Sequence, residues 1–175
     1  MIAAVMSCIL LFSTGIEAKT VYQTAKDAGL STLVAAVDAA GFKSVLDSPS
    51  FKGTVFAPTN EAFAILLEDL GVTADELLSD TKLLKAVLNY HVIPDDRLTT
   101  QSLEQLQSWG TNLGDQLLDI FKGPNGTVRI YYGGVSPGRQ ALKYPGSAKI
   151  IPGLRNIRAD RAIVQVIDRV LVPQL

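Results

Sequence analysis

The closing segment of the chain restricts the possible fold more than any other stretch. Residues 162–173 read AIVQVIDRVLVP and are apolar at nearly every position. A strand with one face in water alternates apolar and polar side chains, whereas an unbroken apolar run is typical of a strand buried on both faces or placed at the centre of a sheet. We therefore expect this segment to be a buried central strand.

Helical spacing dominates the first half of the chain. Residues 31–41 repeat apolar side chains with a period of about 3.6 residues, with Ser31 as the expected cap and Gly41 as the stop. Residues 80–94 show the same spacing, and Pro94 stops the helix at or before His91–Ile93. These two segments predict amphipathic helices.

A strand followed by a third helix is expected between these two segments. Residues 53–58, GTVFAP, form a short apolar burst that ends at a proline and favours a strand. Residues 59–71 then have strong helical spacing. Thr59 and Asn60 stand at the start of this helix, where polar side chains accept hydrogen bonds from free main-chain N–H groups. We predict that both are helix-capping residues.

The second half has the pattern of strands. Residues 115–134 contain two extended runs around a Gly-Pro-Asn-Gly turn, which predicts a hairpin, and residues 147–153 predict one more short strand. Helices come first and most strands come afterwards, without the alternation that a doubly wound fold requires. The predicted fold class is α+β.

The size and charge of the chain limit its function. A chain of 175 residues, 47% hydrophobic, is long enough for one domain with a real core and too short for two ordinary ones. Its 16 basic and 17 acidic residues nearly cancel, and no basic run carries interleaved aromatic residues. We expect no binding of nucleic acid.

The first 18 residues resemble a secretory signal peptide. Ile2–Phe12 is an uncharged apolar run, too short to span a bilayer, and Ala18 offers a small residue at a cleavage point. We expect residues 1–18 to be removed and residues 19–175 to form a single domain that is secreted and has no membrane span. The alternative for the N-terminal segment is a core helix or a retained anchor.

Three segments together resemble the fasciclin domain, also called FAS1. They are GTVFAPTNEAFAIL (53–66), LKAVLNYHVIPDDRLTT (84–100) and AIVQVIDRVLVP (162–173), in the order and spacing of that family. Residues 111–121, TNLGDQLLDIF, are similar to its weaker strand segment. The resemblance implies a FAS1 fold, a wedge of two β-sheets flanked by several α-helices packed on one side. It also implies an extracellular role in cell adhesion and in matrix or cell-wall organisation.

The resemblance also implies a structural lock, meaning buried polar residues that hold the helical part to the sheet. Tyr90 and His91 are the family's Tyr-His pair, and we place Gln165 and Asp168 of the closing strand in the same lock. The family usually carries a histidine where this chain has Gln165, which can form hydrogen bonds but cannot titrate.

His91 is the only histidine, and a histidine can serve as a general base, which leaves an enzyme as an alternative. A hydrolase would need a nucleophile on a strained turn, and the sequence has no G-x-S-x-G motif. One histidine, without a cysteine in the expected secreted chain, gives too few ligands for zinc or copper. We expect a buried neutral His91, no catalytic residue, no metal site and no cofactor; a pH-sensitive hinge is the other reading.

Several sequence features indicate a modification site and candidate binding residues on the surface. Asn125 begins an Asn-Gly-Thr glycosylation sequon in a turn. Residues 131–147 form a long connection rich in Tyr, Gly and Pro, and arginines precede the last strand. Arginine binds carboxylates and acidic glycans in bidentate fashion, although charges at a strand edge also serve only to prevent edge pairing. The candidate interaction surface comprises Tyr131, Tyr132, Arg139, Tyr144, Arg155, Arg158 and Arg161.

These observations predict a secreted, non-catalytic fasciclin-like adhesion module whose partners are cell-surface or matrix proteins or glycans. The alternative is an extracellular binder of an apolar small molecule such as a carotenoid, as in some algal fasciclin-domain proteins. Its groove would lie between the helix at 30–40, the helix at 59–71 and the tyrosine-rich connection. A hydrolase that uses His91 is the third reading.

Overall fold

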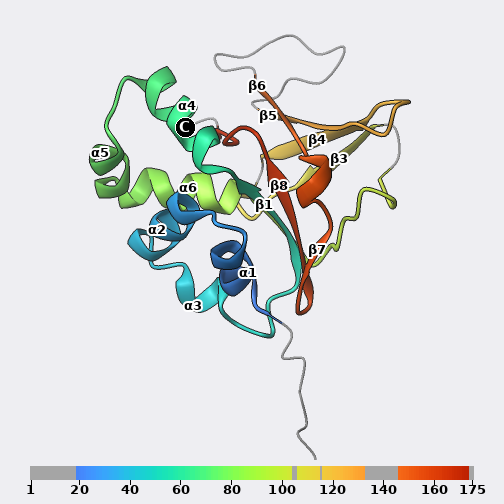
Figure 1. Ribbon diagram of the computed structural model, residues 1–175, viewed down its shortest axis with the longest axis horizontal. Helices are drawn as coiled ribbons and strands as arrows, with labels where there is room; N and C mark the ends of the chain where they lie inside the picture. Colours follow the sequence, from blue (N-terminus) through green and yellow to red (C-terminus); the bar gives the residue numbers. More distant parts are fainter. Residues whose placement is uncertain (1–18, 104–105, 115, 133–145, 174–175) are drawn as a thin grey trace, which may run out of the picture.

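The computed structural model describes residues 19–103, 106–114, 116–132 and 146–173 (Figure 1). Its helices lie in the first half of the chain, as the periodicity predicts: α1 (Val21–Asp27), α2 (Ser31–Ala39), α3 (Lys43–Leu46), α4 (Asn60–Leu70), α5 (Ala74–Ser79) and α6 (Thr81–Tyr90). A short 3-10 turn, η1, spans Pro152–Leu154. The strands are β1 (Gly53–Pro58), β2 (Val92–Pro94), β3 (Leu106–Gly110), β4 (Leu117–Lys122), β5 (Val128–Tyr132), β6 (Gly146–Lys149), β7 (Ile157–Ala159) and β8 (Ala162–Ile167).

The strands form two four-stranded sheets. Sheet A has the order β2-β1-β8-β7, and sheet B is an antiparallel sheet with the order β3-β4-β5-β6. In sheet A the closing strand β8 pairs in parallel with β1 and antiparallel with β7. All six residues of β8 are buried, which confirms the expectation of a central strand covered on both faces.

The predicted hairpin is present as β4 and β5, joined through residues 123–127. Gly123 N donates to Thr127 O at 2.8 Å and closes the turn. At the other end of sheet B the chain crosses into sheet A, because Ile150 pairs with Ile167, the last residue of β8. Ile151 N then donates to Val166 O at 2.9 Å. The two sheets are therefore joined at one corner.

Helices, sheet A and sheet B form successive layers (Figure 1). Side chains on one face of β1 and β8, such as Val55 and Val164, pack with the helices in one buried cluster. Phe56 and Ile167, on the opposite face, pack with inward residues of sheet B in a second cluster. This arrangement confirms the α+β class and the packing of the helices on one side, and it leaves the outer face of sheet B free of described helices.

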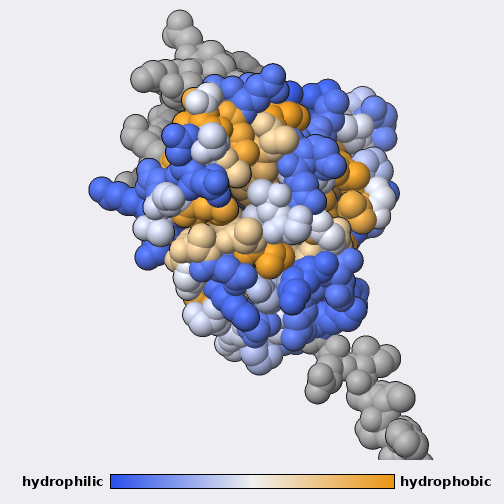
Figure 2. Space-filling model, turned by 60° about the vertical axis from the view of Figure 1, so that its left-hand side comes forward, coloured by the Kyte–Doolittle hydropathy of each residue, from blue (hydrophilic) through white to orange (hydrophobic). Residues whose placement is uncertain are grey.

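The surface of the helical side mixes hydrophilic and hydrophobic residues, as Figure 2 shows. Leu70 belongs to the apolar spacing of the helix that begins at residue 60, yet 42% of its surface is exposed because it lies in the last turn, beside Gly71. The buried residues of that helix, Phe63 and Leu66, lie earlier in it.

The capping expectations differ in outcome. Thr59 is the N-cap of α4, and its hydroxyl accepts from Ala62 N at 3.1 Å. Ser31 is not a cap: it is the first residue of α2, whose N-cap position is Leu30. The start of α2 is instead satisfied from a distance, because Thr32 N donates to Asn60 Oδ1 at 3.0 Å. Asn60 was predicted to cap its own helix, but it is the first residue of α4 and caps α2.

Gly53 is required by close packing of the main chain at the start of sheet A. It has a positive φ of 149°, and a Cβ added there would lie inside van der Waals contact of Ile93 O. A side chain at this position would therefore push β1 and β2 apart.

Candidate functional site

His91 ends α6 and is buried, with 2% of its surface exposed. Its Nδ1 lies 2.7 Å from Val87 O, and Leu171 N donates to its Nε2 at 2.9 Å. A carbonyl oxygen only accepts and a main-chain N–H only donates, so Nδ1 carries the proton and Nε2 is bare. The partners therefore set one neutral tautomer that connects α6 to the segment after β8.

Burial lowers the pKa of His91 from 6.5 to about 4, against the smaller opposing effect of the hydrogen bond to Val87. The imidazole is accordingly neutral at physiological pH. Both nitrogens already have main-chain partners, so a general-base role would require breaking one of these two hydrogen bonds.

Tyr90 holds the same end of α6 to sheet B. Its ring is 1% exposed within the second buried cluster, and its hydroxyl donates to Leu117 O at 3.1 Å. The main chain contributes a third connection, since Phe56 N in β1 donates to His91 O at 2.9 Å. Neighbouring residues of one helix end thus hold sheet B, sheet A and the C-terminal segment.

Gln165 lies in a different place and forms a polar clasp with Leu98, Thr100 and Asn156. Its Nε2 donates to Leu98 O and to Asn156 Oδ1, each at 2.8 Å, and its Oε1 accepts from Asn156 N at 2.8 Å. Asn156 also accepts from Thr100 N at 2.8 Å. The clasp holds the loop after β2 to the β7–β8 hairpin.

Sequence reasoning missed Asn156, whose backbone is left-handed with a φ of 55°. Asparagine tolerates this conformation better than most residues, and that is the one local signal that could have identified it. Thr54 supports the same loop, because its hydroxyl donates to Asp96 O at 2.6 Å and accepts from Leu98 N at 2.7 Å.

Asp168 acts at the corner between the sheets. Lys149 N donates to its carboxylate at 2.7 Å, and Asp168 N donates to Lys149 O at 3.2 Å. The residues placed together in one lock therefore work at separate points. Tyr90 and His91 hold the end of α6, Gln165 holds the loop clasp, and Asp168 holds the corner.

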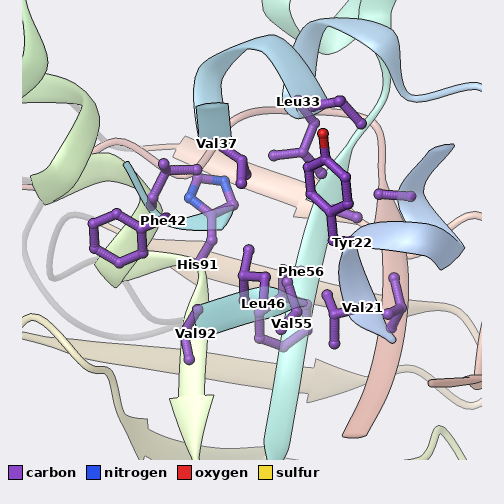
Figure 3. Close-up of a pocket in the computed structure, with 15 residues that line it drawn as sticks. Val21, Tyr22, Leu33, Val37, Phe42, Leu46, Val55, Phe56, His91 and Val92 are labelled. Atoms are coloured by element: carbon purple, nitrogen blue, oxygen red, sulfur yellow. The ribbon is translucent and has the colours of Figure 1, made fainter. Parts of the chain in front are cut away.

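An apolar cavity lies between α1, α2, α3 and sheet A, with His91 in its wall (Figure 3). The space open to the centre of a water-sized sphere is about 20 Å³, close to the volume needed for a single water molecule. Tyr22 is the tyrosine in its lining, which includes no residue of α4. A second pocket brings Ala62, Ile65 and Leu66 of α4 together with Tyr132, so part of the predicted groove is present there. Neither Tyr131 nor α2 lines that second pocket.

The arginines ahead of the last strand lie at an edge of sheet A. Arg155, Arg158 and Arg161 are exposed, and β7 is the outermost strand on that side. None of the three forms an ion pair with another residue in the described ranges. The edge therefore presents positive charge to solvent.

Tyr131 and Tyr132, two tyrosines of the candidate surface, lie on opposite faces of β5. Tyr131 is half-buried on the outer face of sheet B, whereas Tyr132 is 9% exposed and packs in the second cluster. Burial also raises the pKa of Tyr132. The expectation that Tyr132 belongs to an interaction surface is thus wrong, because strand alternation turns it inward. Arg139 and Tyr144 lie outside the described residues.

Asn125 is exposed in the β4–β5 turn, and its side-chain oxygen accepts from Thr127 N at 3.1 Å. Within the described ranges no three His, Cys, Asp or Glu side chains lie close enough together to hold a metal ion. The same part of the chain contains no helix with the length and hydropathy needed to cross a bilayer.

Comparisons with known proteins agree with the architecture. Two proteins of the cyanobacterium Synechocystis are similar to this chain. Protein sll1483 is 32% identical over 146 residues, 83% of this chain and 68% of that protein. Uncharacterized protein sll1735 is 33% identical over 150 residues, 83% of this chain and 91% of that protein.

Among solved structures, the chain is similar to a FAS1 domain pair from the insect cell adhesion molecule Fasciclin I. The TM-score is 0.58 at 22% identity, and the match covers 83% of this chain and 46% of that chain, so the likeness is one of fold. The family model described as the fasciclin domain matches residues 28–173. The chain therefore belongs to the fasciclin domain family.

Proposed function

We propose that this protein is a secreted, non-catalytic interaction module that acts at a cell surface or in an extracellular matrix. The observation that carries the proposal is the use of His91: both ring nitrogens bind the main chain, so the only histidine serves the fold. The similarity of fold to a domain pair from an insect cell adhesion molecule supports an adhesive role.

The surface supports the same proposal. Arg155, Arg158 and Arg161 are exposed without ion-pair partners in the described part of the chain, so they are available to carboxylates on proteins or glycans. Attachment of cells or matrix to immobilised protein tests the proposal, with albumin-coated surfaces as the control. Absence of attachment above albumin would contradict it.

Secretion and modification belong to the proposal and have their own test. We propose that residues 1–18 are a cleaved signal and that Asn125, exposed in its turn, carries a glycan. The intact mass of protein secreted from the full chain should correspond to residues 19–175 plus a glycan. The Asn125→Gln variant should lack the glycan mass, and secreted protein that retains its first 18 residues would contradict the signal assignment.

Binding of an apolar molecule such as a carotenoid is the second candidate function. The apolar cavity beside α1, α2 and α3 favours it, although a polyene would enter only if these helices moved outward. Protein purified from its native source should then absorb visible light and release the pigment into organic solvent. A colourless protein without extractable lipid would exclude this candidate.

A further inference from the structure

The outer face of sheet B carries an unusual arrangement of side chains. Register places Phe121 opposite Arg129, and Arg129 opposite Lys149, in one row across three strands. The next row places Asp119 opposite Tyr131. Because side chains alternate along a strand, both rows point away from the buried inner face of the sheet, which includes Leu118, Ile120 and Ile130.

These side chains reach solvent to different degrees. Lys149 is exposed, while Phe121, Arg129 and Tyr131 are half-buried. Leu117, on the same face of β4, has 48% of its surface exposed. Figure 1 shows α1–α6 on the opposite side of sheet A, so none of these six helices covers this face. The face therefore presents aromatic and cationic groups together.

The row contains two like charges directly opposite each other, which destabilises a sheet. Arg129 and Lys149 form no ion pair with any residue in the described ranges. Two acids lie nearby and accept hydrogen bonds from neutral groups: the Ser108 hydroxyl donates to Asp119, and Lys149 N donates to Asp168. Since neither cation of the row forms an ion pair within the described ranges, both side chains can contact an external anion.

We propose that this face, defined by Phe121, Arg129, Tyr131 and Lys149, binds an acidic polysaccharide. The proposal rests on the proposed extracellular role and names the partner class. Arginine and lysine hold carboxylate or sulfate groups, and the apolar faces of sugar rings pack on the phenylalanine and tyrosine rings. The row spans two interstrand spacings, roughly 10 Å, which suits an extended chain of rings lying flat on the sheet.

The flat geometry distinguishes a polysaccharide from an acidic peptide. A peptide that binds a sheet adds to an edge strand, whereas these four residues lie across the face of β4, β5 and β6. Aromatic rings beside paired cations match a ligand that alternates apolar surface with negative charge. Recognition should therefore depend on the rings as well as on the charges.

Binding of the folded protein to immobilised polygalacturonate, heparin and neutral dextran tests the proposal. The first two probes separate carboxylate from sulfate, and dextran reports sugar without charge. The double variant R129Q/K149Q should bind polygalacturonate or heparin about tenfold more weakly, since two charge-assisted contacts are lost. Phe121→Leu, which keeps apolar volume, should also weaken binding.

The matched control is K82Q/K85Q, which removes the same charge from the exposed surface of α6, away from both proposed binding surfaces. It should change affinity less than twofold, and circular dichroism should show that all variants are folded. Equal losses in both double variants would overturn the proposal, as would equal binding of polyglutamate or the absence of binding to both acidic glycans. Attachment of cells without glycan binding would refute this site alone and leave the proposed function standing.

Discussion

Lowering the pH should destabilise this protein through protonation of His91 in the unfolded chain. The pKa of His91 is about 4 in the folded protein and 6.5 in an exposed imidazole. Since the folded pKa is the lower one, the unfolded chain binds a proton that the folded chain does not. Stability from this source is complete above about pH 7, is lost as the pH falls from 6.5 towards 4, and changes little below that.

The magnitude follows from these two pKa values. Between pH 7.5 and pH 5 the linkage relation gives a loss of about 2 kcal/mol in the free energy of unfolding. A domain of this size is stable by about 5–15 kcal/mol, so the loss is measurable. It corresponds to a fall in melting temperature of roughly 4–8 °C.

The assay is urea unfolding across this pH range, with His91→Asn as the comparison. The asparagine amide can still donate towards Val87 O but does not titrate, so carboxylate effects are common to both proteins. The variant should be less stable at pH 7.5, because Leu171 N loses its acceptor. Its further loss down to pH 5 should be smaller than that of the wild type by about 2 kcal/mol.

The same pH dependence in both proteins would refute the argument. An independent measurement is available, because the chain contains one histidine and so gives one set of imidazole NMR signals. In the folded protein these signals should not titrate above about pH 5. A titration midpoint near 6.5 would show that the imidazole is not held as its two hydrogen bonds indicate.

Other substitutions test the remaining contacts. Gly53→Ala should destabilise the protein by about 2 kcal/mol or more, because its Cβ would meet Ile93 O, while Gly110→Ala, with open space around it, should have little effect; urea unfolding measures both. Gln165→Leu should cost about 2–4 kcal/mol in unfolding free energy by leaving the clasp groups without partners, and an unchanged denaturation midpoint would show that the clasp does not contribute to stability. Asn60→Ala should cost about 1 kcal/mol because α2 loses its cap, and hydrogen exchange of the Thr32 amide should accelerate; unchanged protection there would contradict the assignment.

Sequence patterns were sufficient to predict a structural feature when all the residues that form it lie in one short segment. The apolar run of β8 predicted burial on both faces, and the Gly-Pro-Asn-Gly turn predicted the β4–β5 hairpin. The Thr59 cap depends on an N–H three residues away, which is within the same segment. The family resemblance supplied the layer order, which periodicity alone does not give.

Features that depend on distant parts of the chain were not predictable in this way. Asn60 caps a helix that precedes it by some thirty residues, because α2 and α4 meet only in the folded protein. The clasp at Gln165 likewise requires Leu98 and Asn156 to be brought together from separate loops. The inward direction of Tyr132, by contrast, was available locally, because alternation puts it on the face of Val128 and Ile130 and puts Tyr131 on the face of Arg129.

The parallel pairing of β1 with β8 has a consequence for the order of folding. The partners Gly53 and Ala162 are separated by more than a hundred residues, so sheet A acquires its central strand only after nearly the whole chain exists. Closing so long a loop costs entropy before any contact repays it, which makes this pairing a slow step. During synthesis the helices should form early, with their apolar faces exposed to solvent until β8 is made. A chain cut before residue 162 should therefore remain a substrate for chaperones and proteases.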